Sequence, residues 1–381
     1  MVVGASVRAI AESAARAGRD VHAADLFGDR DLLAVARSYA RAVPYPDVLP
    51  QLVAGFPAGP WIYTGGLENH PEIIAEISRH RPLAGCTVPA VRQVRDPTQL
   101  GILARSAGLR YPETRFSPGA VPVDGSWLVK PRCSAGGHGI GRWRGRLDDT
   151  PADDRQLWQE NVPGRPWSVA MLVTPGGADL IGASRQLIGS RWTAARPFHW
   201  SGGLDIDPAS LPRSVAKLLQ RLGRELANVP GLVGLVGVDL IVDRQLGLTL
   251  LEINPRPTAS MELIERGTGL SLATAQLAAC GLALPGSPAA ASPRRQTWAK
   301  AVLFAASPLV IDERSEAVLD TLARSWRAAD GQPAIADLPL PPQTIATGRP
   351  ICTVFAAGPS PAAALCLLRH RVHELRQQLC A

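Results

Sequence analysis

Residues 251–256 end an apolar stretch and contain a carboxylate, an amide and a guanidinium. A second carboxylate, that of Asp239, lies in another apolar stretch upstream. Glu252 and Asn254 are two positions apart, so on a β-strand their side chains point to the same face. Their oxygens are hard ligands of the kind that Mg²⁺ takes together with waters and nucleotide phosphates. Asp239 would add the second carboxylate, and Arg256 would emerge at the tip of the strand. The pattern predicts a Mg²⁺ or Mn²⁺ site that faces a phosphate-bearing substrate.

The segment between these two apolar stretches favours a hairpin. Residues 237–242 are rich in β-branched side chains, and residues 243–247 have the composition of a turn. Antiparallel pairing across that turn would bring Asp239 beside Glu252 and Asn254. The alternative is an ordinary hairpin that carries a surface aspartate, a surface glutamate and an Asn-Pro turn.

A glycine-rich loop follows a short apolar strand that ends in a lysine. Only three of the 40 basic residues are lysines, namely Lys130 in this strand, Lys217 and Lys300. Glycines let backbone N–H groups approach phosphate oxygens, and a lysine adds a point charge. No Gly-Lys-Ser/Thr sequence follows, so this loop is not a P-loop, and a structural hairpin stays an alternative. The candidate phosphate-binding residues are Lys130, Ser134, Gly136, Gly137 and Gly139.

Taken together, these motifs resemble those of the ATP-grasp superfamily over about residues 85–280. The Lys-Pro pair before the glycine-rich loop is similar to the family's phosphate lid. The Gln159-Glu160 pair, followed by Gly164, resembles its hinge, and an acidic residue followed by Glu-x-Asn-Pro-Arg resembles its metal-binding pattern. The resemblance implies an ATP-grasp fold of mixed α/β and α+β content.

The resemblance also implies a role for each motif. Lys130 would contact the α- and β-phosphates of ATP, and the glycine-rich loop would close over the β- and γ-phosphates. Backbone groups at the hinge would recognise adenine, and the three metal-ligand candidates would hold one or two Mg²⁺. Arg256, helped by Arg185 from another strand, would neutralise charge on the transferred phosphoryl group. The alternative for Arg185 is a solvated strand residue. The hinge candidates are Gln159, Glu160 and Val162.

One part of the family pattern is missing. Many ATP-grasp enzymes carry a first phosphate-binding lysine directly after an aspartate, and here Pro97 follows Asp96 at the matching place. Arg92 or Arg95 could substitute, although arginine is not a neutral replacement for lysine at a point-charge site. This phosphate contact is therefore an open question at the level of sequence.

The first part of the chain alternates strand-like and helix-like segments. An N-terminal strand, an alanine-rich helix up to Gly18 and a second strand ending at Asp25 predict a parallel, Rossmann-like sheet. In open α/β sheets the carboxyl ends of the strands line the substrate crevice. The alternative for polar residues there is a role in caps and turns. Candidate contacts of the acceptor substrate are Ser6, Arg8, Glu68 and Asn69.

Three parts are expected along the chain. Residues 1–84 would form the Rossmann-like domain, and residues 85–283 the ATP-grasp domain, with its lid at about residues 110–165. Residues 284–295 are rich in Pro, Ala and Ser and would form a linker. Residues 296–381 would form a small β-rich cap, similar to that of the biotin-carboxylase branch, which packs on the rest and could support a homodimer.

The composition of the 381 residues is typical of a soluble enzyme. Hydrophobic residues make up 46% and charged residues 19%, which argues against disorder. No apolar run is long enough for a membrane helix, and no secretory signal is recognisable. The six scattered cysteines indicate free thiols in a reducing cytoplasm, without a zinc site or a disulfide framework. The net charge of +7 comes from dispersed arginines, so no nucleic-acid partner is expected.

The activity that the resemblance implies is a ligation of two small molecules. A carboxylate would attack the γ-phosphate of ATP, and an amine would displace phosphate from the acyl phosphate to form an amide. A closer similarity to an ATP-grasp group associated with tetrahydromethanopterin- and methanofuran-linked one-carbon metabolism suggests ligation of an amino acid such as glutamate. Two alternatives stay open. One is a carboxylase that uses bicarbonate through carboxyphosphate, and the other is a nucleotide-binding partner subunit without catalysis.

Overall fold

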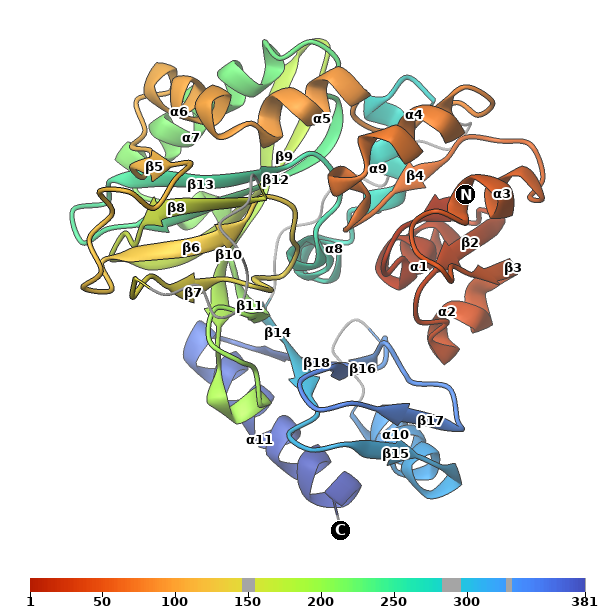
Figure 1. Ribbon diagram of the computed structural model, residues 1–381. Coiled ribbons are helices and arrows are strands. Elements are labelled where there is room, and N and C mark those ends of the chain that lie inside the picture. The colour runs from red at the N-terminus through yellow and green to blue at the C-terminus, as the bar shows by residue number, and fades with distance from the viewer. Residues whose placement is uncertain (146–154, 283–295, 327–330, 381) are drawn as a thin grey trace.

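The computed structural model describes residues 1–145, 155–282, 296–326 and 331–380. The predicted linker lies outside these ranges, and so does a part of the predicted lid. In Figure 1 the N-terminal sheet lies at the right, the central strands lie at the left and the C-terminal part lies below them. Within the described ranges, no helix combines the length and the apolar character that a membrane span requires.

The N-terminal part contains a parallel sheet of four strands in the order β3-β2-β1-β4, which confirms the predicted Rossmann-like arrangement. Its strands are β1 (Val2–Val3), β2 (Val21–Asp25), β3 (Ala36–Arg41) and β4 (Ile62–Tyr63). Its helices are α1 (Arg8–Arg16), α2 (Arg30–Val35), α3 (Leu49–Ala54) and α4 (Pro71–Ser78). Strands β1, β2 and β4 are largely buried, whereas the edge strand β3 is half-buried or exposed.

Two helices, α5 (Val88–Arg95) and α6 (Pro97–Ser106), connect this sheet to the rest of the chain. The Asp96 carboxylate caps α6 by accepting hydrogen bonds from the N–H groups of Thr98 and Gln99. Pro97 is the first residue of α6, where its missing N–H has no consequence. The departure from the family pattern at this position therefore has a local cause, because the Asp-Pro pair starts a helix.

A second, smaller sheet lies in the part of the chain predicted to be the lid and is called the lid sheet here. Its antiparallel strands are β5 (Thr114–Arg115), β6 (Trp127–Pro131), β7 (Gly141–Arg142) and β8 (Gln156–Glu160), in the order β5-β8-β6-β7. Three tryptophans, Trp127, Trp143 and Trp158, pack with Val121 into a core of its own. The separate core allows this sheet to hold its shape apart from the central sheet.

The central sheet has eight strands in the order β13-β12-β9-β10-β11-β14-β18-β16. They are β9 (Arg165–Thr174), β10 (Gly177–Ile188), β11 (Trp200–Ile206), β12 (Gly234–Val242), β13 (Leu248–Asn254), β14 (Thr297–Phe304), β16 (Ile335–Ala336) and β18 (Pro350–Gly358). Helix α7 (Arg213–Ala227) contacts β9 and β10, while α8 (Glu262–Thr268) and α9 (Leu272–Ala279) follow β13 along the chain. The buried residues of α7 recur at helical spacing, as expected for a helix with one apolar face: Val215, Leu219, Leu222 and Leu226.

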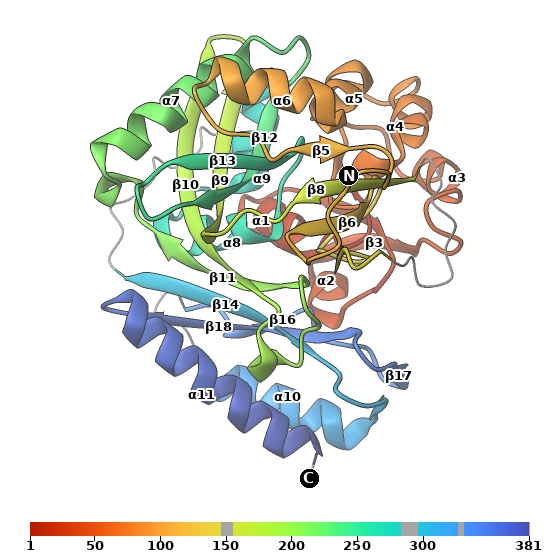
Figure 2. The same cartoon turned by 60° about the vertical axis from the view of Figure 1, so that its left-hand side comes forward.

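The C-terminal part extends the central sheet, because β14 pairs with β11 and β18 pairs with β14. A short antiparallel pair of strands, β15 (Leu309–Ile311) and β17 (Gln343–Ile345), belongs to the same part, with helices α10 (Glu313–Ser325) and α11 (Pro361–Cys380). Figure 2 shows α11 running along β14 and β18 on the outer side of the molecule. The predicted β-rich cap thus shares a continuous sheet with the preceding part of the chain.

Candidate active site

The hairpin β12–β13 brings the predicted metal ligands together. Asp239 and Glu252 are direct cross-strand partners, and the register shifts immediately after Asp239. Asn254 Nδ2 donates to Asp239 Oδ2 at 3.3 Å. Gln186 on β10, a residue that the sequence analysis did not single out, donates from Nε2 to Asp239 Oδ1 at 2.8 Å. Two carboxylates and two amides therefore meet on one face of the central sheet.

The electrostatics of this face favour a bound cation. Burial, reinforced by the neighbouring charge of Glu252, raises the pKa of Asp239 to about 6. In the described part of the chain, no group of three or more His, Cys, Asp or Glu side chains is placed to hold a metal ion. Asp239, Glu252 and Asn254 fit Mg²⁺ as a partial shell, because Mg²⁺ takes its other ligands from water and phosphate.

Arg95 at the end of α5 points at these carboxylates. Its guanidinium forms an ion pair with Glu252 and donates from Nη2 to Asn69 Oδ1 at 3.1 Å. Arg92, the other candidate for the missing phosphate contact, is exposed on α5. Of the two arginines, Arg95 is therefore the one that the fold places at the carboxylates.

Lys130 approaches the carboxylates from the lid sheet. Its Nζ donates to Gln159 Oε1 at 2.8 Å, and Gln159 Nε2 donates to Thr114 Oγ1 at 3.1 Å. Burial lowers the pKa of Lys130, whereas the nearby charges of Glu252 and Asp239 oppose this effect. Gln159 is buried and orients Lys130, so it acts on the cleft through the lysine.

The glycine-rich loop is docked against residues 198–200. The Trp200 N–H donates to the Gly136 carbonyl at 3.0 Å, and Asn69 Nδ2 donates to the Ser134 carbonyl at 3.3 Å. Gly137 has a φ of 81°, and a Cβ there would lie 2.0 Å from the Phe198 carbonyl oxygen. The loop can approach this segment only because residue 137 has no side chain.

The predicted hinge spans the end of β8 and the connection from β8 to β9, which joins the lid sheet to the central sheet. Glu160 N–H donates to the Glu113 carbonyl at 2.9 Å, and Glu113 N–H donates to Glu160 Oε2 at 3.4 Å. Val162 follows in the connecting segment and is partly exposed. Glu160 and Val162 are therefore placed at the junction of the two sheets, where a nucleotide base could meet their backbone.

Arg256 leaves the end of β13 and turns toward the N-terminal part. Its Nη2 donates to Glu68 Oε1 at 2.6 Å and to Asn254 Oδ1 at 3.3 Å. Burial opposes ionisation of Glu68, which lies in the 3₁₀ turn η1 (Leu67–Asn69), but Arg256 outweighs this and lowers its pKa. Arg256 Nε is buried without a hydrogen-bond partner among the described residues. Glu68 thus holds Arg256 in place and leaves one donor free.

Two predicted residues do not join the set. On β10, Arg185 is adjacent to Gln186, so alternation directs Arg185 to the opposite face from Asp239. Arg8 is buried, and its guanidinium is already paired with Glu262 and with Asp337. Arg185 is therefore not on the carboxylate face. The ion pairs of Arg8 leave it little capacity for a direct substrate contact.

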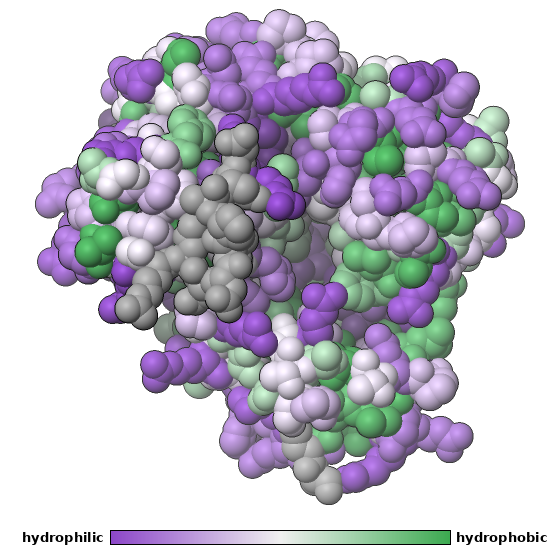
Figure 3. Space-filling model, in the orientation of Figure 1, coloured by the Kyte–Doolittle hydropathy of each residue, from purple (hydrophilic) through white to green (hydrophobic). Residues whose placement is uncertain are grey.

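A cavity of about 390 Å³ adjoins the site. Its wall combines the N-terminal loops, the glycine-rich loop, the segment after β13 and the C-terminal strands. Ser6 and Arg256 both line it, whereas Glu68 and Asn69 do not. Figure 3 shows the surface hollowed between these parts. Its position between four separate segments suits an acceptor substrate.

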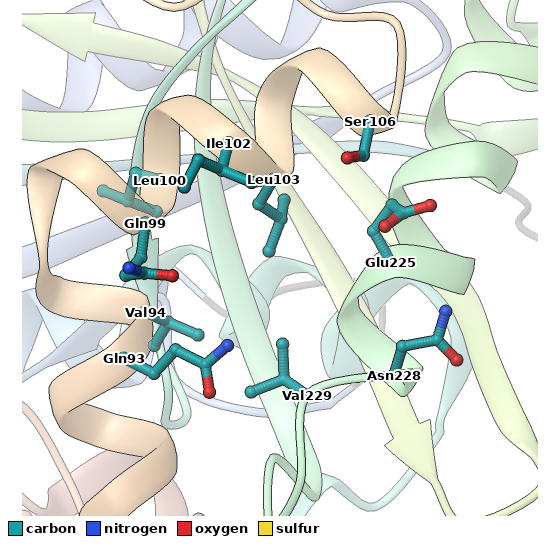
Figure 4. Close-up of a pocket in the computed structure, with 10 residues that line it drawn as sticks. All are labelled: Gln93, Val94, Gln99, Leu100, Ile102, Leu103, Ser106, Glu225, Asn228 and Val229. Carbon is teal, nitrogen blue, oxygen red and sulfur yellow. The ribbon is translucent and has the colours of Figure 1, made fainter.

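A second cavity, of about 160 Å³, lies between α5, α6 and α7 (Figure 4). Ile102 and Leu103 line it on one side, and Glu225 and Asn228 on the other. None of the predicted site residues contributes to its wall.

Comparisons with known proteins agree with this arrangement. A family model described as an ATP-grasp domain matches residues 102–260. A sequence search of curated proteins finds no match. Residues 102–260 of the chain therefore match an ATP-grasp domain.

Solved structures share the fold over almost the whole chain. Carboxyaminoimidazole ribonucleotide synthase from Aspergillus clavatus, complexed with ATP, has a TM-score of 0.70 and 15% identity, over 99% of this chain and 98% of that one. A second structure is the biotin carboxylase domain dimer of Hydrogenobacter thermophilus 2-oxoglutarate carboxylase, with MgADP and bicarbonate. It has a TM-score of 0.66 and 12% identity, over 94% of this chain and 86% of that one. L-amino acid ligase from Bacillus licheniformis has a TM-score of 0.63 and 13% identity, covering 99% and 96%. At these identities the likeness shows the fold alone, and that fold is ATP-grasp.

Proposed function

We propose that the protein is an ATP-dependent ligase that joins a small carboxylate to an amine. One juxtaposition carries this proposal: Arg256 borders the Asp239–Glu252 pair and also lines the 390 Å³ cavity. A phosphoryl group held at the carboxylates would therefore lie next to a substrate held in the cavity. Lys130 supplies the positive charge on the opposite side of the cleft.

The residues of the cleft have complementary tasks. Lys130 and the N–H groups of the glycine-rich loop would bind phosphate oxygens, and the connection after β8 would receive the adenine. Asp239, Glu252 and Asn254 would hold Mg²⁺, which when bound neutralises phosphate charge. Arg95 now neutralises Glu252, and we propose that it turns to the phosphates when the carboxylate takes a metal ion. It would then replace the missing lysine.

The proposed reaction has two steps. An oxygen of the substrate carboxylate attacks the γ-phosphorus of ATP, ADP leaves, and an acyl phosphate forms. The amine nitrogen then attacks the acyl carbon, phosphate leaves, and the nitrogen loses a proton to give the amide. Arg256 would stabilise negative charge on the transferred group in both steps, because it borders the place where that charge develops.

The finer proposal concerns the substrates. The similarity to the one-carbon group supports an amino acid, such as glutamate, as the carboxylate. The resemblance of the C-terminal part to the biotin-carboxylase cap supports a homodimer as the assembly. The Hydrogenobacter thermophilus structure, a domain dimer with bicarbonate, supports a second candidate in which bicarbonate is the carboxylate. The amine-ligase proposal takes precedence because the cavity is large enough for an organic acceptor.

Phosphate release from Mg-ATP tests the proposal. The purified protein is supplied with pooled amino acids, primary amines and pterins, with bicarbonate, or with both. Release that requires an amino acid and an amine supports the ligase, and dividing the pool then identifies the pair. Release with bicarbonate alone would assign a carboxylase. ATP binding without release in any mixture would contradict catalysis and favour a nucleotide-binding subunit.

A further inference from the structure

Arg256 in the cavity wall pairs with Glu68, and the remaining charged part of the wall, called the floor here, has more carboxylates than cations. Asp29, Asp337 and Glu262 line it together with Arg8 and Lys300. Arg8 Nε pairs with Asp337 at 2.8 Å, and Lys300 Nζ pairs with Glu262 at 2.7 Å. These pairs use both cations and leave the third carboxylate, that of Asp29, without one.

Further acids compete for the same arginine. Glu12 lies 3.0 Å from Arg8 Nη1, and Asp31 lies 3.6 Å from Arg8 Nε. Glu12 is shared with Arg16, and Asp31 also accepts the N–H groups of Asp337 and Leu338. The arginine is therefore saturated and cannot also neutralise Asp29.

Asp29 has the properties of a group that awaits a ligand. It precedes α2, it is only 8% exposed, and it lines the cavity. Among the described residues, its carboxylate forms no hydrogen bond and no ion pair. Burial and the nearby carboxylates of Asp337, Asp31 and Asp25 raise its pKa to about 9, against a smaller opposing effect of Arg8. The raised pKa favours the neutral form of Asp29, and a cation beside it would stabilise the ionised form instead.

The rest of the wall defines the body of such a ligand. Leu272, Val302, Phe304 and Ile351 provide apolar surface. At the lid side, His199 is 7% exposed, and its Nδ1 is buried without a partner in the described structure. His199 is therefore a second polar residue of the cavity wall, besides Asp29, with an atom that has no hydrogen-bond partner in the described structure.

His138 from the glycine-rich loop also lines this end of the cavity. Its ring centroid lies 4.3 Å from that of His199. Burial lowers the pKa of both imidazoles, and the nearby guanidinium of Arg196 adds to the effect. Neutral imidazoles at one end and carboxylates at the other make the floor the natural position for a cationic group.

We propose that the cavity binds the acceptor as a small primary amine with an apolar body, and that Asp29 receives its ammonium group. This inference rests on the proposed ligation, in which an amine is the second substrate. The amine would enter as a cation in exchange for the proton of Asp29 and lie with its apolar part against Val302 and Phe304. It would return one proton to the Asp29 carboxylate before its nitrogen, then neutral, attacks the acyl phosphate. Asp29 recognises the substrate from the side of the N-terminal sheet, opposite the lid.

Binding of n-hexylamine without ATP tests this assignment. Titration calorimetry of wild type, Asp29→Asn and Asp20→Asn compares this amine with 1-hexanol and hexanoate. Asp20 is a matched control because it lies on the same N-terminal part and is 66% exposed in a surface pair with Arg37. We expect the dissociation constant of n-hexylamine to rise roughly tenfold or more in Asp29→Asn and to stay unchanged in Asp20→Asn. We expect 1-hexanol to bind wild type and Asp29→Asn equally.

Two results would overturn the assignment. One is equal n-hexylamine affinity in wild type and Asp29→Asn, and the other is tighter binding of hexanoate than of n-hexylamine by wild type. The binding assay does not depend on catalysis, so it separates the two proposals. Amine binding that requires Asp29, without phosphate release in any mixture, would contradict the ligase and support the amine site. Amine-dependent phosphate release that persists at wild-type KM in Asp29→Asn would contradict the amine site alone.

Discussion

Replacing Asp29 with asparagine should stabilise the folded protein at neutral pH. The structure raises the pKa of this carboxyl from 3.8 to about 9. Between these two pH values the folded state retains the proton and the unfolded state releases it. Each unit by which the pH rises therefore lowers the free energy of unfolding by about 1.4 kcal/mol. The stability that protonated Asp29 contributes is complete below pH 3.8 and is lost as the pH rises toward 9. At pH 7 the free energy of unfolding is lower by roughly 4 kcal/mol for this reason. Asparagine avoids this loss because it is neutral and almost isosteric with aspartic acid.

Thermal unfolding from pH 4 to pH 8 measures this effect. The unfolding midpoint of Asp29→Asn should equal that of wild type near pH 4 and exceed it by about 5 °C or more at pH 8. Asp20→Asn, at the exposed surface, should follow wild type throughout. A difference that does not change with pH would refute the reasoning, and so would an Asp29→Asn variant that is less stable at pH 8. Either result would mean that Asp29 is ionised in the fold.

Three further predictions concern the cleft. Gly137→Ala should weaken ATP binding in calorimetry more than Gly136→Ala does. Both glycines have a positive φ, but only a Cβ at residue 137 would meet a carbonyl oxygen, at 2.0 Å. Equal affinities of the two variants for ATP would contradict the docked loop. Lys130→Met should remove most of the rise in unfolding temperature that ATP produces. The control Lys217→Met, at an exposed position on α7, should retain this rise. A full ATP-induced rise in Lys130→Met would exclude the phosphate contact. Glu68→Gln should lower the free energy of unfolding in urea by roughly 3–5 kcal/mol, because Arg256 then lacks a buried negative charge beside it. Exposed Glu72→Gln is the control, and equal midpoints in the two variants would disprove the structural role of the pair.

Local sequence patterns were sufficient for the parts of the fold with a clear period. The β-branched runs around the turn at residues 243–247 predicted the hairpin, and the pairing of Asp239 with Glu252 follows directly from its register. The strand-and-helix rhythm of the N-terminal residues likewise predicted a parallel sheet. Both inferences depend on contacts between segments that are near in sequence.

Contacts between distant segments were beyond these patterns. Gln186 reaches Asp239 from another strand, and Arg95 reaches Glu252 from a helix in a different part of the chain. Arg185 illustrates the same limit, since a shift of one residue along β10 changes the face to which a side chain points. The continuation of the central sheet into β14 and β18 also depends on long-range pairing. The position of Asp29 in the cavity is a further consequence of that assembly.

The role of Glu252 in ATP turnover is the most direct test of the central claim. Phosphate release from Mg-ATP is measured with the active substrate pool for wild type, Glu252→Gln and Glu76→Gln, an exposed matched control on α4. We expect Glu252→Gln to lose activity by roughly a hundredfold or more while it keeps a cooperative unfolding transition, and Glu76→Gln to retain wild-type rates. Wild-type turnover in Glu252→Gln would contradict the assignment of the β12–β13 carboxylates as the site of phosphoryl transfer.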